Sequence, residues 1–343
     1  MKKMLNTFYI TSPDAYLSLD GENVVVKQDG SELRRVPLHN LEGIVTFGRQ
    51  GASPALMGKC AKAGIYLVFM TEYGRFQASI VGEEQGNVLL RKAQYRYADD
   101  EQKSLEISKN ILIGKLHNSR WVLERTIRDH PLRVDTEKIK RISDFISNAT
   151  KSIRKARHPG ELFGLEGEAA SLYFSVFDEM ILTNKDDFYF KKRTKRPPLD
   201  NVNALLSFAY TLLANDVSAA LSAVGLDPFV GFLHKDRPGR RSLAMDIMEE
   251  LRAPFADRFV LKLINLRQIT KDDFTQRENG ATILKDESRK VFLEAWQKRK
   301  QETLEHPFLK EKISWGLVSH AQALLLSRFL RGDLDEYPPF LWK

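Results

Sequence analysis

Short apolar runs separated by turn residues dominate the first part of the chain. Gly43–Phe47 and residues 65–70 are almost entirely apolar, as buried strands are. Between these two runs, Ser53 is typical of a helix cap, Pro54 of a first helical turn and Gly64 of a helix end. Further candidate strands, rich in aromatic and β-branched residues, lie at residues 7–10, 16–19, 24–26 and 76–81.

From about residue 99 the apolar spacing becomes helical. Apolar positions recur every three or four residues over the segments 100–130, 136–157 and 161–183. A mostly apolar stretch at residues 202–220 predicts a buried helix, and we expect helices to continue to residue 330. The pattern therefore predicts an α+β protein, with a small β-rich N-terminal domain over residues 1–98 and a larger all-α domain over residues 99–343.

One loop interrupts the helical part. Residues 186–198 contain two prolines and a dense basic run, made of Lys191, Lys192, Arg193, Lys195 and Arg196. Such a run suits either a solvated loop or contact with DNA backbone. More basic candidates for DNA contact follow at Arg237, Arg240, Arg241 and Arg252.

Composition narrows the class of protein. Among 343 residues, 53 are Lys or Arg and 45 are Asp or Glu, which gives a net charge of +8 and favours a polyanionic partner, nucleic acid first. A single cysteine, Cys60, excludes a disulfide framework and is expected to serve packing. No apolar run approaches the roughly 18 residues of a membrane span. We therefore expect a cytoplasmic protein without a membrane segment or a signal peptide.

Glu166 lies on the apolar side of the helix predicted at 161–183. It comes four residues after Leu162 and three before Ala169, whereas Glu168 points away from this side. A carboxylate among apolar neighbours needs a cation or a donor, because it loses hydration there. The position suits either a metal ligand or an ion pair with Lys or Arg.

His234, Asp246 and Glu249 are weaker candidates when each is taken alone. His234 directly follows an apolar run, where a structural histidine is common. Asp246 and Glu249 are three residues apart and share a helix face, but a solvated acidic helix start would look the same.

Taken together, the four acidic and histidine candidates favour a metal site. Glu166, His234 and Glu249, with Asp246 one turn earlier, offer oxygen and imidazole ligands without sulfur, which suits Mg²⁺ or Mn²⁺ rather than structural zinc. An ion with open positions activates an oxygen nucleophile at a phosphodiester. The sequence holds no Gly-rich phosphate loop and no Gly-x-Ser-x-Gly elbow.

Several segments resemble the CRISPR adaptation integrase family, the universal endonuclease that inserts new spacers into CRISPR arrays. The similarity spans most of the chain and is closest to the branch that accompanies compact type I systems. It rests on LHNLEGIVTFG at 38–48, FGLEGEAASLYF at 163–174, RPPLDNVNALLSFAYTLL at 196–213, GFLH at 231–234 and DIMEELRAP at 246–254.

The resemblance implies a β-rich N-terminal domain for dimerisation and partner contact, followed by a helical catalytic domain. It implies a homodimer that assembles with the small ferredoxin-like second CRISPR-associated protein into a hetero-hexameric complex on double-stranded protospacer and repeat DNA. The family's metal ligands fall on Glu166, His234 and Glu249, and Asp246 matches a nearby acidic position in the catalytic set.

The implied activity is metal-dependent transesterification, in which a DNA 3′-hydroxyl attacks a phosphodiester of the CRISPR repeat. Two alternatives stay open at this stage. One is a branched-DNA nuclease of repair, and the other is a non-catalytic DNA-binding scaffold whose carboxylates only pair with basic side chains.

Overall fold

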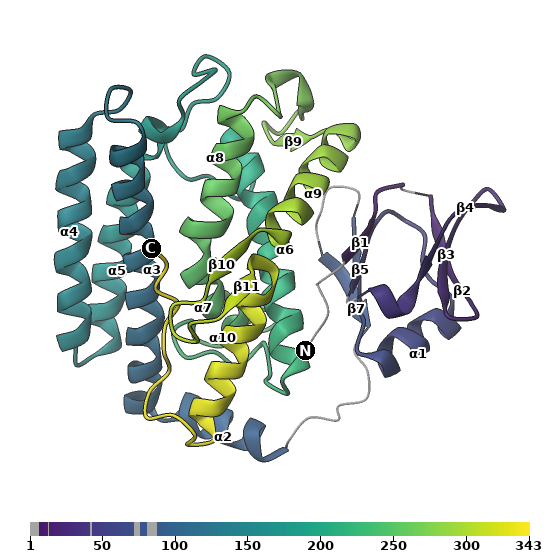
Figure 1. Cartoon of the computed structure of the whole chain (residues 1–343), viewed down its shortest axis with the longest axis horizontal. Helices are drawn as coiled ribbons and strands as arrows, with labels where there is room; N and C mark the ends of the chain where they lie inside the picture. Colours follow the sequence, from purple (N-terminus) through teal and green to yellow (C-terminus); the bar gives the residue numbers. More distant parts are fainter. Residues whose placement is uncertain (1–6, 13, 42, 72–75, 81–87) are drawn as a thin grey trace. The chain divides into compact units, whose positions relative to one another are not determined.

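The computed structural model describes residues 7–12, 14–41, 43–71, 76–80 and 88–343 (Figure 1). Contacts within the chain divide it into two compact units. The first comprises Met1–Gln85 with Leu284–Glu302, and the second comprises Gly86–Ile283 with Thr303–Lys343. The hydrophobic pattern did not indicate that Leu284–Glu302 groups with the N-terminal unit. The expected functional boundary between residues 98 and 99 stays a prediction.

Two sheets are present among the described residues of the N-terminal unit. The first is an antiparallel meander of β2 (Tyr16–Asp20), β3 (Asn23–Gln28) and β4 (Ser31–Pro37). The second has the order β1-β5-β6-β7, in which β7 alone is antiparallel, and its strands are Thr7–Ile10, Gly43–Phe47, Tyr66–Met70 and Phe76–Ile80. Leu17, Ile44 and Leu67 are completely buried in the core that links the sheets.

Among its described residues, this unit has two α-helices and the short 3-10 helix Leu38–Asn40. Helix α1 (Pro54–Ala63) has the predicted ends, because the Ser53 hydroxyl accepts from the Leu56 amide at 3.2 Å and Gly64 ends the helix with a φ of 68°. Helix α9 (Asp286–Gln301) packs on the mixed sheet, since Gln297 Nε2 donates to the Thr7 carbonyl at 2.7 Å. Cys60 is fully buried on α1, as expected for a packing residue.

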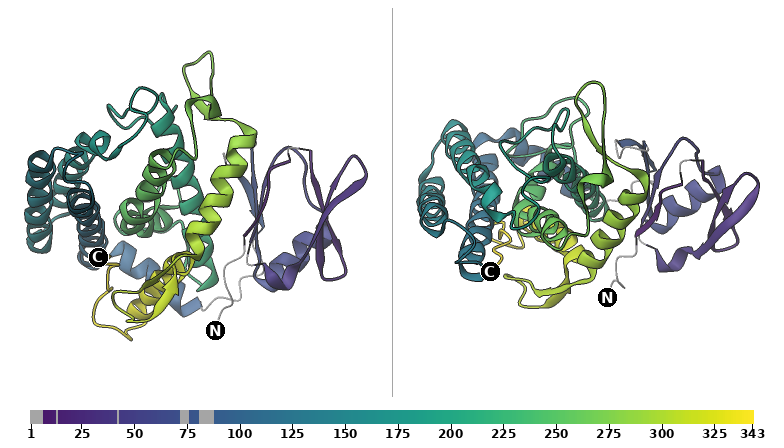
Figure 2. Two further views of the ribbon diagram at one scale, coloured as in Figure 1. Left: turned by 45° about the horizontal axis from the view of Figure 1, so that its top comes forward. Right: turned by 90° about the horizontal axis from the view of Figure 1, so that it is seen from above.

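The second unit is a bundle of helices (Figures 1 and 2). Its α-helices in the described part of the chain are α2 (Val88–Asp99), α3 (Glu101–Asp129), α4 (Thr136–Lys155), α5 (Pro159–Ser175), α6 (Asn201–Ala223), α7 (Ser242–Leu251), α8 (Arg258–Asn265) and α10 (Trp315–Leu330). Helix α3 packs against α4, α5 and α7, and both views of Figure 2 show α3, α4 and α5 side by side. The expected order of a β-rich segment followed by helices is confirmed.

Helix α6 is the central helix of this bundle. It is long and apolar enough to cross a membrane by length and composition, but 56% of its apolar window is buried inside the protein. It packs against α7, α8 and α10, and Leu205 and Leu206 are fully buried. Its hydrophobicity is therefore explained by its place in the core.

Some local structure differs from the expectation of continuous helices to residue 330. Two short strand pairs interrupt them, β8 (Phe274–Gln276) with β9 (Thr282–Leu284) and β10 (Thr303–Glu305) with β11 (Lys312–Ser314). Each strand has only three residues, too few to show an alternating pattern. Between α7 and α8 the chain forms a π-helical turn, Arg252–Asp257, which contains Pro254. Proline lacks an amide donor and favours such an irregular turn.

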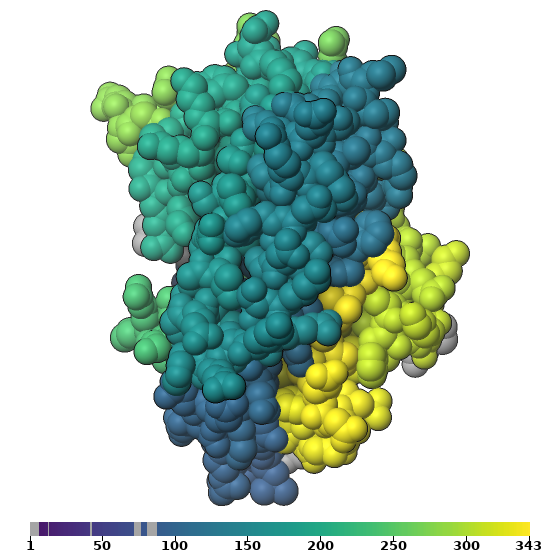
Figure 3. Space-filling model, turned by 90° about the vertical axis from the view of Figure 1, so that its left-hand side faces the viewer, coloured from purple at the N-terminus to yellow at the C-terminus, as the bar shows by residue number. Residues whose placement is uncertain are grey.

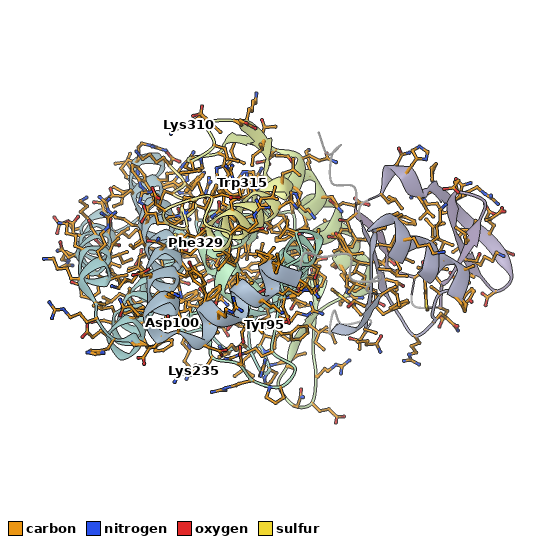
Figure 4. The ribbon with its side chains drawn as sticks, turned by 90° about the horizontal axis from the view of Figure 1, so that it is seen from below. Tyr95, Asp100, Lys235, Lys310, Trp315 and Phe329 are labelled. Atoms are coloured by element: carbon orange, nitrogen blue, oxygen red, sulfur yellow. The ribbon has the colours of Figure 1, made fainter. Side chains whose placement is uncertain are left out.

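Helix α2 holds the loop that leads to His234. Gln94 is buried, and its side-chain amide donates to the carbonyls of Asp227 and Val230 at 2.8 Å each. Tyr95 donates to the Asp227 carboxylate at 2.9 Å. Figure 4 labels Tyr95 on α2 and Phe329 on α10, the helix that packs beside α2.

Candidate active site

Three helices bring two of the predicted carboxylates to one cation. Lys115 on α3 makes ion pairs with Glu166 on α5 and with Glu249 on α7, the latter at 2.9 Å from Nζ to Oε2. Exposed fractions are 14% for the Lys115 side chain, 27% for Glu166 and 3% for Glu249. The neighbouring Glu168 is exposed, as the helical spacing predicted. Glu166 and Glu249 thus converge although they lie far apart in sequence.

Glu249 is buried in a strongly positive environment. Burial alone would raise the pKa of this carboxyl, but the charges of Arg252, Lys115 and His234 lower it to about 2. Arg252 makes an ion pair with Glu249 Oε1 at 2.8 Å. The carboxylate is therefore ionised at all physiological pH values, and the imidazole of His234 lies within its electrostatic reach.

Asp246 fixes the position of His234. Asp246 is completely buried, and its carboxylate accepts the amides of Phe232, Leu233 and His234 at 2.7, 3.0 and 2.9 Å. Asp246 Oδ1 also lies 2.7 Å from His234 Nδ1. Because a carboxylate only accepts, Nδ1 donates to Asp246 and Nε2 is the ring nitrogen that is left for another partner.

This close arrangement requires a glycine before Phe232. A Cβ atom at Gly231 would lie 2.8 Å from Asp246 Oδ2 and 2.8 Å from Ser242 Cβ. No other residue therefore fits at this position without a shift of α7. The alternative of a solvated acidic helix start is wrong for Asp246 and Glu249, because both are buried.

Glu250 faces a different set of partners from Glu249. Its carboxylate accepts from the Phe340 amide at 2.6 Å, from the Tyr337 hydroxyl at 2.7 Å and from Gln322 Nε2 at 3.0 Å. Burial raises the pKa of Glu250 to about 8. Asn118 on α3 donates to the carbonyls of Glu250 and Phe340 at 2.7 and 2.8 Å. The C-terminal residues thus hold the end of α7 that carries Glu249.

Asp257 is a further buried carboxylate near the site that the sequence did not reveal. It accepts from the hydroxyls of Tyr173 at 3.0 Å and Tyr210 at 2.5 Å, and burial raises its pKa to about 6. The Arg252 guanidinium lies over the Tyr210 ring, 5.1 Å from its centroid. This cluster thus also contacts the arginine that pairs with Glu249.

The basic candidates divide into exposed and supporting side chains. Arg193 donates to Asn203 Oδ1 at 2.7 Å and to Ser207 Oγ at 3.0 Å, and burial lowers its pKa. Arg241 donates to Asn215 Oδ1 at 2.8 Å, and Arg240 Nε donates to Ser242 Oγ at 3.2 Å. The exposed candidates are Lys191, Lys192, Lys195, Arg196 and Arg237.

The donor set has the chemistry of a divalent-metal site, although Lys115 lies between two of its members. Among the described residues, no three His, Cys, Asp or Glu side chains are grouped closely enough to hold a metal ion. Glu249 Oε2 is nevertheless buried, and it faces the Lys115 ammonium at 2.9 Å without a well-aligned hydrogen bond within the described part of the chain. A buried oxygen of this kind, beside a second carboxylate and an oriented imidazole, fits a metal ligand.

Comparison with known proteins identifies the family. The sequence profile of the family described as CRISPR associated protein Cas1 matches residues 8–298. The chain belongs to the Cas1 family. It is 49% identical over 343 residues to CRISPR-associated endonuclease Cas1 1 of Chlorobaculum tepidum, and the match covers 100% of both chains. The family resemblance noted in the sequence motifs is thus confirmed, while the type I branch stays a prediction.

Solved structures show the same fold. A casposase bound to an integration product is 21% identical, with a TM-score of 0.84 over 98% of this chain and 93% of that chain. A Cas6-RT-Cas1–Cas2 complex contains a chain that is 23% identical, with a TM-score of 0.82 over 100% of this chain and 36% of that one. At these identities the likeness establishes the Cas1 fold alone.

Proposed function

We propose that this chain captures foreign DNA fragments and inserts them as spacers into the CRISPR array by metal-dependent transesterification. Its membership of the Cas1 family makes it a CRISPR-associated endonuclease and integrase, an enzyme that acts on DNA. The observation that carries the assignment of its active site is the convergence of Glu166 and Glu249 on one cation, the Lys115 ammonium, with His234 close enough to Glu249 to act on it electrostatically.

Glu166, Glu249 and His234 Nε2 are the proposed ligands of Mg²⁺ or Mn²⁺. The bound ion supplies positive charge at the transferring phosphate and activates the attacking oxygen. Asp246 is assigned a positioning role rather than direct ligation, because its oxygens already accept from three backbone amides and from His234. Arg252 keeps Glu249 ionised and oriented.

The proposed chemistry exchanges one phosphodiester for another. The oxygen of a donor 3′-hydroxyl forms a bond to phosphorus, and the bond from phosphorus to the 3′-oxygen of the repeat strand breaks. The proton of the attacking hydroxyl is returned to the departing oxygen, so no net hydrolysis occurs. With water as the nucleophile, the same site would act as an endonuclease.

The exposed basic side chains of the loop at 186–198, with Arg237, are proposed to contact DNA backbone. Four further arginines are proposed to support this surface indirectly, because their hydrogen bonds and ion pairs hold the loop, α7 and the carboxylates in place. They are Arg193, Arg240, Arg241 and Arg252.

The proposed assembly is a homodimer that joins the small ferredoxin-like second CRISPR-associated protein in a hetero-hexamer on double-stranded DNA. A chain of similar fold occurs in the complex described as Cas6-RT-Cas1–Cas2, which supports this partner. Residues 1–98 are proposed to make the dimer and partner contacts, and residues 99–343 the catalysis. The proposed location is the cytoplasm.

A strand-joining assay tests the catalytic assignment. Purified protein is incubated with its partner, a 3′-hydroxyl donor duplex and a repeat-bearing plasmid, in Mn²⁺ or Mg²⁺. We expect Glu166→Ala to abolish joined products and the matched variant Glu168→Ala, which changes an exposed carboxylate on the same helix, to keep them. Joined products from Glu166→Ala at the wild-type level would refute the assignment.

A second candidate, a non-catalytic DNA-binding scaffold, is favoured by one observation. Glu166 and Glu249 both pair with Lys115, as a scaffold would require. The two functions differ in their response to metal. If the residues bind a catalytic metal, Mn²⁺ should raise the melting temperature of the wild-type protein but not that of His234→Ala. A scaffold would show neither effect.

A further inference from the structure

A groove lined by positive charge lies between α3 and α4. It has a volume of about 520 Å³ and is lined by side chains of both helices, among them His117, Arg120, Ser147, Lys151, Arg154 and Lys155. None of its lining residues is a carboxylate, as far as the described chain shows. Figure 3 views the helical unit from the side that α4 covers, with the yellow C-terminal residues beside the blue and teal helices.

The groove is separate from the candidate active site. Lys115 and His117 differ by two positions on α3, which places them roughly 200° apart around the helix axis. Lys115 contacts the two active-site glutamates, whereas His117 Nε2 lies 3.1 Å from the Trp342 carbonyl. A ligand in the groove would therefore lie on a different face of α3 from the proposed metal ligands.

The positive groups of the groove are available to a ligand. Lys151, Arg154 and Lys155 are exposed, and no ion pair among the described residues involves them. Arg120 lies 3.6 Å from Glu124, but this carboxylate also accepts from Lys140 and makes a hydrogen bond with a serine of α4. The negative charge of Glu124 is therefore shared between Arg120 and Lys140.

Two features of the groove suit a negatively charged ligand. Burial lowers the pKa of His117 and the charges of Lys343 and Arg120 lower it as well, although the hydrogen bond with the Trp342 carbonyl acts in the opposite direction. Arg120 Nε is buried and has no hydrogen-bond acceptor in the described structure. An anion in the groove would offset these repulsions and would offer the missing acceptor.

The spacing of the side chains suits an extended polyanion. Ser147, Lys151 and Lys155 recur at intervals of four residues along one face of α4, and the row spans about 12 Å at 1.5 Å per residue. A DNA strand presents a phosphate about every 3.4 Å along the duplex axis. The row therefore matches several successive phosphates better than it encloses a single small anion.

We propose that the groove between α3 and α4 is a second DNA-backbone site, which holds duplex DNA outside the catalytic centre. The proposal rests on the proposed function, because it assumes that the chain acts on DNA. It extends that function, because it assigns contact with duplex DNA to a face of the helical unit that does not carry the proposed catalytic residues.

Binding of a fluorescent duplex of about 40 base pairs, measured at several salt concentrations, tests the site. The double variant Arg154→Gln/Lys155→Gln should bind about tenfold more weakly at about 0.1 M salt, and the slope of log affinity against log salt should fall by about two. Lys140→Gln is the matched control, because this α4 lysine is already paired with Glu124 and Asp144 at 2.8 and 3.2 Å.

The outcomes separate the two proposals. A single Lys151→Gln variant should lower the slope by about one, and unchanged melting temperatures should show that all variants are folded. If wild-type protein binds the duplex while the double variant keeps its affinity and slope, the groove proposal is overturned alone. If wild-type protein does not bind DNA, the proposed function itself fails.

Discussion

Lys115 is the cation that contacts both glutamates of the candidate site. Its ammonium lies between two carboxylates from different helices, and all three side chains are largely withdrawn from water. Such a cation offsets the repulsion between Glu166 and Glu249 and holds them together before any metal binds. A divalent ion that binds both carboxylates must therefore displace Lys115 or share them with it.

The variant Lys115→Met tests this competition. In metal-free buffer its free energy of unfolding should be about 3 kcal/mol lower than that of wild-type protein, because the buried Glu249 loses a partner. Added Mn²⁺ should then raise its melting temperature by more than it raises that of wild-type protein. Thermal unfolding with EDTA and with excess Mn²⁺ measures both effects, and Lys109→Met on the same helix is the control. Equal metal responses in the two proteins would contradict the competition.

Asp246→Asn tests the role of the residue that positions His234. An asparagine side chain keeps the size of the aspartate but replaces one acceptor oxygen with an NH₂ donor, which cannot accept the amides that Asp246 now accepts. The variant should therefore bind Mn²⁺ about 10–100-fold more weakly, since the ring of His234 is no longer fixed. Calorimetric titration with Mn²⁺ gives the affinity. Asp236→Asn, an exposed position nearby, should match wild-type protein; wild-type affinity in Asp246→Asn would exclude the positioning role.

At the scale of elements, α7 is held from both of its sides. Glu249 pairs with α3 and with Arg252, whereas Glu250 receives the Phe340 amide and the Tyr337 hydroxyl from the C-terminal residues. Consecutive residues on a helix point about 100° apart, so this arrangement uses two faces of the same turn. The C-terminal residues therefore contribute to the orientation of a proposed metal ligand without contacting it.

Glu250 makes stability depend on pH. Burial raises its pKa in the folded protein to about 8, above the unfolded value of 4.5, so the folded state binds more protons between these values. Stability from this group should be greatest below about pH 4.5 and should decline as the pH rises toward 8, by a few kcal/mol in total. In Glu250→Gln this decline should vanish. Chemical unfolding at pH 5, 6, 7 and 8 compares the two proteins, and parallel pH profiles would refute the idea.

The sequence predicted elements where the hydrophobic pattern was long and clear. Helices α3, α4 and α6 and the apolar strands β5 and β6 were found within a few residues, because each buries a regular apolar face. Strand β4 was missed because most of its residues are exposed and three of its seven are charged. The packing of α9 on the N-terminal mixed sheet depends on contacts between residues far apart in sequence, and the local spacing of apolar residues does not predict such contacts.

The same limit applies to the candidate site. Glu166 could be placed on an inward helix face from its apolar neighbours, and motif resemblance selected His234 and Glu249. Lys115 gave no signal, because a lysine in a long amphipathic helix is usually solvated. The separate roles of Asp246, Glu249 and Glu250 were also hidden, since they depend on which partner each buried carboxylate meets in three dimensions. The standing of these residues as metal ligands and catalytic groups stays a prediction.

At the scale of the whole molecule, the chain crosses between its two compact units three times. Helix α9 belongs to the unit of the N-terminal sheets, although in sequence it lies between two segments of the helical unit, Gly86–Ile283 and Thr303–Lys343. Each unit has its own buried core, with Leu17 and Phe292 in one and Leu205 and Ile247 in the other. Two separate cores allow two unfolding transitions, and the proposed metal ligands all belong to the second unit.

Calorimetric unfolding can therefore assign each transition to a unit. Trp296 on α9 is fully buried and stacks on Phe292 with ring centroids 6.4 Å apart. Trp296→Ala should lower one transition only, by the equivalent of about 3–5 kcal/mol, because it leaves a cavity in the N-terminal unit. Mn²⁺ should raise only the other transition, because it binds the folded helical unit. A single transition that responds to both changes would mean that the units unfold as one cooperative body, and the separation of metal binding from the N-terminal core would then be wrong.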